Sequence, residues 1–199
     1  GNHPTRVELV DRSTTPIEGV TAGGIRTTDR DIDLDVIVWA TGFDAVTGAF
    51  DAIEFTGVDG VTLKDVWSDG PRTFLGLAVP GLPNLFTVAG VHNVSPFCHM
   101  PRCIEQTVDW IAALITRMAQ RGESRVEATA AASDEWTSHV YETASRLLMN
   151  KVDSWFHGVN ANVKKTRTQT ALIYAGGAPT YREKCEESAA NDYAGFTFS

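Results

Sequence analysis

A run of five apolar residues, at positions 36–40, constrains the fold of this 199-residue chain more than any other stretch. Two of the five are valine and one is isoleucine, and the run passes directly into Thr41 and Gly42. An uninterrupted apolar run that ends at a turn residue is typical of a strand buried on both faces of a parallel sheet. The sequence therefore predicts an α/β fold in which a ligand can approach the backbone at Gly42.

Short strand patterns lie on both sides of this run. Residues 5–10 alternate between polar and apolar, and residues 16–20 and 24–27 flank an Ala-Gly pair, which predicts a β-hairpin. A second apolar run at residues 84–89 is closed by Gly90 and predicts a second buried strand. No Gly-x-Gly-x-x-Gly follows any of these strands, so we expect no dinucleotide-binding fingerprint within this chain.

Two amphipathic helices are predicted in the second half of the chain. The first begins near Pro101 and ends at Gly122, because proline is tolerated in a first helical turn and glycine often follows a last turn. Its apolar residues recur at helical spacing: Ile104, Val108, Ile111, Ile115 and Met118. The apolar residues of the second helix lie four apart: Trp136, Val140, Ala144 and Leu148. Trp110 and Trp136 are interpreted as core residues of this pair, and residues 181–190 as a last short helix.

The composition excludes several classes of partner. A net charge of −8 and an isoelectric point near 5.0 argue against a nucleic acid or an anionic membrane surface. No apolar run approaches the ~20 residues of a membrane span, and no signal-peptide pattern opens the chain. Three cysteines with irregular spacing favour free thiols in a reducing compartment, so we expect a cytoplasmic protein.

A segment without periodicity, residues 150–168, mixes aromatic residues with glycine and asparagine and ends in a basic patch. A polar loop that carries tryptophan and phenylalanine is a candidate mobile binding loop. Two simpler interpretations stay open: the basic patch can be a solvated charge run, and Trp155 can pack the loop against the second helix.

Five short motifs follow one another along the chain: Ala-Thr-Gly-Phe-Asp at 40–44, Gly-Pro-Arg-Thr-Phe-Leu-Gly at 70–76, Pro-Asn-Leu-Phe at 83–86, Ile-Glu-Gln at 104–106 and Ser-Trp at 154–155. In this order they resemble the C-terminal part of Baeyer–Villiger monooxygenases of the phenylacetone and cyclohexanone monooxygenase type. The resemblance covers essentially the whole chain. Members of the family are more than twice this length, so the chain looks like a piece of an enzyme.

The resemblance implies the C-terminal portion of an α/β flavoprotein with two dinucleotide-binding domains, built from buried parallel strands, a β-hairpin and a C-terminal helical pair. Residues 1–40 would end the NADPH-binding domain, and residues 41–199 would form the C-terminal part of the FAD-binding domain. The complete enzyme would use FAD and NADPH to insert one oxygen atom of O2 next to a ketone carbonyl, giving an ester or lactone. The N-terminal remainder would hold both glycine-rich fingerprints and the catalytic arginine, so we expect no catalytic residue here and no activity from this chain alone.

Binding residues are also implied by the resemblance. The loop at residues 91–100 would line the substrate pocket with five side chains: Ser95, Pro96, Phe97, Cys98 and Met100. The Met100 backbone amide would also face the flavin, and a helix that begins near Pro101 would direct its positive end there. The remaining cofactor contacts would come from Thr41, Gly42 and Asp44, and from Trp155 on a mobile loop at residues 150–168. In that loop, the Asn-Val-Lys-Lys at 162–165 departs from the family's Asn-x-Pro-Gly-Lys, which leaves its closed conformation open.

Other interpretations of these residues stay open. His92, Cys98, His99 and Cys103 are metal-ligand residue types, but their spacing matches no zinc pattern, so no metal is expected. Cys98 near a helix start could be a reactive thiol, although no general base for it is evident.

Three alternative functions come from different classes of protein. A disulfide-reductase-like flavoprotein also carries Ala-Thr-Gly, but its last strand is followed by Gly-Asp, where this chain has Gly90 and Val91. A flavin N- or S-hydroxylating monooxygenase shares more of the motifs. An inactive or binding-only fragment is compatible with the missing glycine-rich loops.

Overall fold

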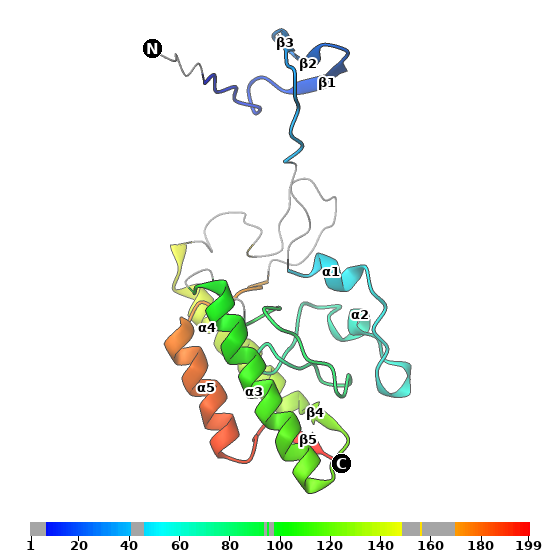
Figure 1. Ribbon diagram of the computed structural model, residues 1–199, viewed down its shortest axis with the longest axis vertical. Coiled ribbons are helices and arrows are strands. Elements are labelled where there is room, and N and C mark those ends of the chain that lie inside the picture. The colour runs from blue at the N-terminus through cyan, green and yellow to red at the C-terminus, as the bar shows by residue number, and fades with distance from the viewer. Residues whose placement is uncertain (1–6, 41–45, 94, 96–97, 149–155, 157–169) are drawn as a thin grey trace. The chain divides into compact units, whose positions relative to one another are not determined.

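The computed structural model describes residues 7–40, 46–93, 95, 98–148, 156 and 170–199. The chain divides into two units, Gly1–Gly42 and Phe43–Ser199 (Figure 1). Within the described residues, the first unit contains a small antiparallel sheet, and the second contains the longer helices and a two-stranded sheet.

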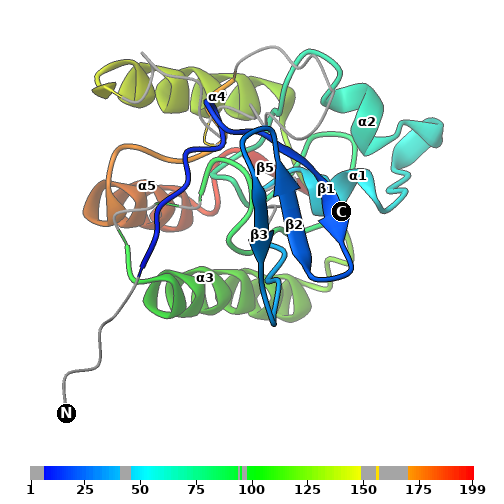
Figure 2. The same cartoon turned by 90° about the horizontal axis from the view of Figure 1, so that it is seen from above.

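The sheet of the first unit has its strands in the order β1-β2-β3, namely Ile17–Thr21, Gly24–Thr27 and Asp31–Asp33 (Figure 2). Val20 of β1 lies opposite Ile25 of β2, which lies opposite Ile32 of β3. The predicted hairpin is therefore confirmed, and a third short strand extends it.

The two buried parallel strands that the sequence predicts are absent from the described residues, whose sheets are all antiparallel. At residues 36–40 the chain forms no strand, and Val36, Val38 and Trp39 are 74%, 82% and 67% exposed. The prediction is wrong here because a buried strand needs hydrogen-bonding neighbours, and the described residues supply none. Residues 84–89 are not a strand either, since positive φ angles at Asn84 (59°) and Ala89 (52°) break an extended backbone.

A small cluster opens the second unit. Two short helices, α1 (Gly48–Asp51) and α2 (Leu63–Val66), flank the 3-10 turn η1 (Val58–Gly60). A capping box begins α2: the Thr62 side chain accepts from the Asp65 amide, and the Asp65 carboxylate accepts from the Thr62 amide. Leu63 packs here with Val79 and Leu82.

The main core is formed by α3 (Met100–Arg121), α4 (Ala130–Ser145) and α5 (Ala178–Ala190) together with the antiparallel pair β4 (Val126–Ala128) and β5 (Phe196–Phe198). The predicted helices are confirmed, although α4 ends before Leu148 and α5 begins before residue 181. Trp110 and Trp136 are both buried in this core, as predicted. No helix among the described residues is long and apolar enough to span a membrane.

Helix α3 presents apolar residues on more than its buried face. Ile111, Leu114 and Met118 are buried against the core. In contrast, Ile104, Val108 and Ile115 are 37%, 47% and 52% exposed. The sequence pattern thus predicts the helix correctly but does not show that several of its apolar side chains stay uncovered by the described residues.

Candidate functional site

The loop that leads into α3 begins as buried backbone. Val91, His92, Asn93 and Ser95 are all buried, although a loop normally runs over the surface. Buried backbone and side-chain polar groups need hydrogen-bond partners, so the contacts of this segment show what holds it in place.

Two hydrogen bonds hold His92. Its backbone amide donates to the Leu172 carbonyl at 2.9 Å, and its Nδ1 lies 3.0 Å from Thr73 Oγ1. His92 adopts a φ of 66°, an unusual conformation for a residue with a side chain. The surrounding contacts therefore hold His92 in a conformation that the chain would rarely adopt alone.

Asn93 is held by the tight turn at Gly76. Its Nδ2 donates to the Gly76 carbonyl at 3.0 Å, which also accepts from Thr87 Oγ1 at 2.7 Å. Gly76 has a φ of 64°, and a Cβ placed there would lie 2.5 Å from the Asn93 nitrogen. Gly76, the last residue of the Gly-Pro-Arg-Thr-Phe-Leu-Gly motif, thus allows the loop and the turn to approach each other.

The electrostatics of His92 favour a neutral ring. Burial lowers its pKa to about 4, and the nearby Ala171 carbonyl opposes this only in part. The Oδ1 of Asn93 has no hydrogen-bond partner among the described residues. Each unsatisfied buried polar atom costs on the order of 1–3 kcal/mol, so this anchor carries unused hydrogen-bonding capacity.

The Thr73–His92 pair has the residue types of a nucleophile and its base, but its surroundings do not suit that chemistry. Both side chains are buried, with exposed fractions of 1% and 0%, and the pKa of His92 is lowered to about 4. Nucleophilic catalysis needs an accessible hydroxyl and a base oriented by a third group. We therefore interpret the pair as an anchor of the loop.

The end of the loop forms the N-terminus of α3. His99 is the N-cap in an extended conformation, and its side chain makes no capping hydrogen bond. Its carbonyl accepts from the amides of Arg102 and Cys103, at 3.0 and 3.2 Å. The first turn contains no acidic residue, and Met100 is half-buried within it. Pro101 has no N–H, so such a helix end can attract a negatively charged group through the Met100 amide and the positive end of the helix dipole.

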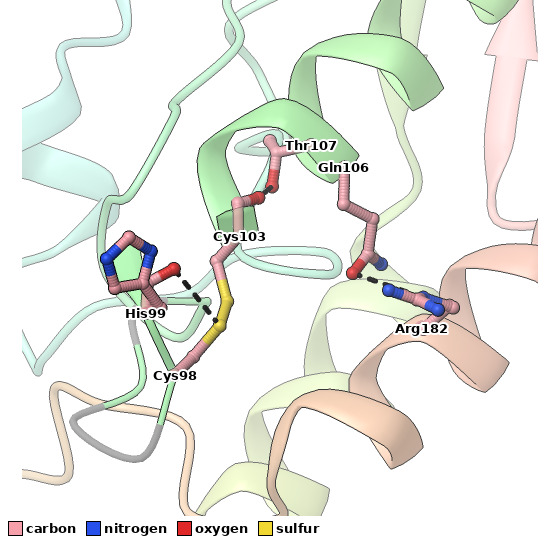
Figure 3. Close-up of a disulfide and its surroundings, with 6 residues drawn as sticks. All are labelled: Cys98, His99, Cys103, Gln106, Thr107 and Arg182. Carbon is pink, nitrogen blue, oxygen red and sulfur yellow. Dashed lines mark hydrogen bonds between the residues drawn. A yellow bond between two sulfur atoms is a disulfide. The ribbon is translucent and has the colours of Figure 1, made fainter. Parts of the chain in front are cut away.

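A disulfide joins Cys98 to Cys103 across this helix start, with 6.5 Å between the two Cα atoms (Figure 3). The expectation of three free thiols is therefore wrong for two of the cysteines, because the turn into α3 brings them within bonding range. Cys185 is free and buried, and burial raises the pKa of its thiol to about 12. The described residues contain no group of three or more ligand side chains that could hold a metal ion.

Three predicted pocket residues are placed by the structure along one short segment. Ser95 is buried, while Cys98 and Met100 are half-buried, so the loop brings them together at the start of α3. The other predicted site residues lie outside the described part of the chain: Thr41, Gly42, Asp44, Pro96, Phe97 and Trp155.

The anchor residues Thr73, His92 and Asn93 were not predicted as part of the site. Only a weak signal points to them, a histidine and an asparagine directly after an apolar run and Gly90. Such residues are more often exposed turn residues than buried ones.

A separate cavity of about 300 Å³ lies between α4 and α5, where Phe74, Trp136 and Lys184 contribute to its wall. None of the predicted pocket residues lines it. It is therefore distinct from the loop at residues 91–100.

Comparison with known proteins identifies the relatives of this chain, although no protein-family model matches it. A 2-oxo-Δ3-4,5,5-trimethylcyclopentenylacetyl-CoA monooxygenase from Pseudomonas putida is 42% identical over 190 residues, which are 96% of this chain and 35% of that protein. A closed crystal structure of cyclohexanone monooxygenase superposes with a TM-score of 0.87 at 39% identity, covering 98% of this chain and 36% of that one. The chain is homologous to a portion of Baeyer–Villiger monooxygenases.

Two further relatives of these Baeyer–Villiger monooxygenases bear on cofactors and chemistry. A crystal structure of OTEMO in complex with FAD and NADP has a TM-score of 0.86 at 42% identity, covering 98% of this chain and 35% of that one. A phenazine N-monooxygenase from Lysobacter antibioticus is 39% identical over 191 residues, 96% of this chain and 34% of that protein. The chain thus spans about a third of the length of the relatives it matches.

Proposed function

We propose that this chain is the C-terminal part of an FAD- and NADPH-dependent Baeyer–Villiger monooxygenase. The complete enzyme inserts one oxygen atom of O2 next to a ketone carbonyl and forms an ester or lactone. The observation that carries this proposal is the 42% identity to a monooxygenase over 96% of the chain. In this assignment residues 1–40 end the NADPH-binding domain, and residues 41–199 belong to the FAD-binding domain.

The helix start at Met100 suits a flavin. FAD, when bound, activates O2 for transfer to the ketone, and its pyrimidine edge becomes negative on reduction. The first turn of α3 offers the Met100 amide and the positive end of the helix dipole, without a competing carboxylate, so it can stabilise that charge. The amide of Met100 would face the flavin, and its side chain would contribute to the pocket.

The rest of the pocket and cofactor site is assigned through the resemblance. Ser95, Pro96, Phe97 and Cys98 would form the pocket wall together with Met100. Thr41, Gly42 and Asp44 would contact the cofactors, and Trp155 would cover the bound NADP. The buried anchor at His92 and Asn93 supports this arrangement, because a precise pocket needs a wall held on a rigid base.

Exposed apolar surface supports the presence of an N-terminal remainder as the partner of this chain. Val36, Val38 and Trp39 are each well exposed, and Val108 and Ile115 of α3 are 47% and 52% exposed. Exposed apolar side chains that lie close together on one segment or one helix often mark a contact with another part of a protein. We infer that the remainder of the enzyme covers it and supplies the strands that residues 36–40 would join.

The test is product analysis with the complete enzyme. Incubation with NADPH, O2 and a panel of cyclic and linear ketones should give esters or lactones that are one oxygen atom heavier than the substrate. Incorporation of label from 18O2, and not from labelled water, identifies the oxygen source. NADPH oxidation without any oxygenated ketone product would contradict the proposal.

A second candidate is oxygenation at nitrogen, favoured by the 39% identity to the phenazine N-monooxygenase. The same assay with aromatic N-heterocycles, phenazine among them, distinguishes the two. Formation of N-oxides with no ester or lactone would favour this second function.

A further inference from the structure

The disulfide between Cys98 and Cys103 encloses the start of α3. Cys98 lies one residue before the N-cap His99, and Cys103 lies in the first turns of the helix, where its carbonyl accepts from Thr107 Oγ1 at 2.9 Å (Figure 3). The ring that it closes contains Met100 and Pro101. The bond therefore ties one predicted pocket residue, Cys98, to the helix that would face the flavin.

The two cysteines differ from the third in their accessibility. Both are half-buried, whereas Cys185 is only 2% exposed and the pKa of its thiol is raised to about 12. A thiolate at a helix N-terminus is stabilised by the positive end of the helix dipole, and the thiolate is the species that attacks peroxides and disulfides. The pair can thus react reversibly under conditions in which Cys185 stays inert.

The position of the pair means that its oxidation state affects the start of α3. One end of the loop is anchored by His92 and Asn93. Without the disulfide, the other end is held by weaker contacts, such as the 3.3 Å hydrogen bond from the Cys98 amide to the Ser95 carbonyl. Closing the disulfide therefore fixes the helix start at residues 98–103, which follows the anchored residues His92 and Asn93 along the chain.

We propose that Cys98 and Cys103 form a reversible thiol–disulfide modification site that responds to peroxides and sets the rigidity of the start of α3 at residues 98–103. One thiolate attacks hydrogen peroxide, the O–O bond breaks, and a sulfenic acid and hydroxide form. The second thiol then displaces the sulfenic oxygen as water, so two thiols and one peroxide give one disulfide and two waters. A dithiol reductant reopens the bond by exchange. The modification itself does not depend on the proposed function. An effect of the disulfide on ketone oxidation does rest on it.

Trypsin offers a direct readout on the complete enzyme. Cleavage after Arg72, Arg102 and Arg117 places Cys98 on the peptide 73–102 and Cys103 on the peptide 103–117. After treatment with hydrogen peroxide and alkylation, the two peptides should be found joined. After dithiothreitol they should be separate, each carrying one alkyl group, and a second peroxide treatment should join them again.

Three variants control this experiment. Cys98→Ser and Cys103→Ser should each abolish the joined peptides, and Cys185→Ala should leave them unchanged. Hydrogen exchange tests the effect on the helix start: peroxide should slow exchange at residues 98–103 several-fold in the wild type and not in Cys98→Ser. Separate alkylated peptides after peroxide, or equal exchange in the two states, would overturn the proposal.

The effect on catalysis is measured separately. The ratio of kcat/KM for a bulky ketone to that for a compact one should fall on oxidation in the wild type and stay constant in Cys103→Ser. If no ketone is converted but the peptides still join reversibly, the proposed function fails and the modification site stands. If ketones are converted and the peptides never join, the modification site fails and the proposed function stands.

Discussion

His92 shows at the scale of one residue how burial decides chemistry. Its ring is fully buried, Nδ1 pairs with Thr73, and the Ala171 carbonyl lies nearby. Burial keeps this histidine neutral, so protonation of its ring would destabilise the folded protein. The consequence is a pH dependence of stability whose sign follows from the direction of the pKa shift.

We predict that His92 makes the enzyme less stable in mild acid. Burial lowers its pKa from 6.5 to about 4, so the unfolded state binds a proton first as the pH falls. The contribution of the neutral His92 ring to the free energy of unfolding is complete above pH 6.5. It is lost between pH 6.5 and about 4, by ~3 kcal/mol in total. Melting temperatures of the complete enzyme at pH 7.5 and 5 should show a smaller acid loss in His92→Gln than in the wild type.

His139 provides the control for that measurement. Burial also lowers its pKa, but the ring is more accessible and its Nε2 lies 3.0 Å from the Tyr174 hydroxyl. His139→Gln should therefore reduce the acid loss less than His92→Gln does. An identical pH profile in His92→Gln and the wild type would contradict the role given to His92.

Gly76 allows a prediction about close approach. In Gly76→Ala, the new Cβ would lie 2.5 Å from the Asn93 nitrogen at a backbone φ of 64°. We expect a loss of more than ~2 kcal/mol in the free energy of unfolding, because loop and turn must separate. Gly60→Ala is the matched control: its φ is 79° but nothing lies within 4 Å, so a loss of only ~1 kcal/mol is expected. Equal losses in the two variants, measured by chemical denaturation, would contradict a steric role for Gly76.

At the scale of elements, the helices owe their limits to local signals. Gly122 ends α3 with a φ of 68°, and its amide donates to the Ala119 and Met118 carbonyls. Thr129 begins α4 by accepting a hydrogen bond from the Ala132 amide at 3.2 Å. The loop before α3 differs, because its shape depends on Thr73, Gly76 and Leu172 from distant parts of the chain. The limits of α3 therefore follow from local sequence, whereas the conformation of residues 92–93 depends on contacts with distant parts of the chain.

The loop at residues 150–168 carries a prediction at the same scale. If Trp155 covers NADP, Trp155→Ala should weaken NADPH binding and increase hydrogen peroxide release, because water enters when the loop opens. If Trp155 packs against α4, the same change should lower the melting temperature and leave the coupling of NADPH use to product unchanged. Affinity, peroxide yield and melting temperature are measured on one variant. Normal affinity together with normal coupling would exclude the covering role.

At the scale of the whole molecule, the chain has the core of a folded unit and the surface of an incomplete one. Trp110, Leu114 and Tyr174 are buried in a continuous core. Trp39 and Val108 are well exposed, although both are large apolar residues. This combination fits our proposal that the chain packs against the rest of a longer enzyme.

We predict that this chain alone does not retain FAD. The adenosine and diphosphate parts of a dinucleotide need a glycine-rich turn followed by a helix N-terminus, and the sequence contains no such fingerprint. Purified alone, the chain should release flavin on gel filtration, whereas the complete enzyme should retain it in a ratio near one. Retention of stoichiometric FAD by the isolated chain would contradict the division of the binding site that we propose.

Features that depend on neighbours within a few residues could be predicted from the amino-acid sequence. The hairpin at β1 and β2, the end of α3 at Gly122 and the burial of Trp110 and Trp136 follow from turn residues and helical periodicity. The ordered motifs also identified the family, which the comparisons confirm.

Features that need a distant partner became visible only in the folded chain. Residues 36–40 have the pattern of a buried strand, yet Val36 and Val38 are exposed because the described residues provide no neighbouring strand. The pairing of Cys98 with Cys103 and the burial of His92 depend on how the loop turns into α3 and against Leu172. Hydrophobicity shows that a residue favours burial, but the covering surface comes from other parts of the chain and, in the function that we propose, partly from the rest of a longer enzyme.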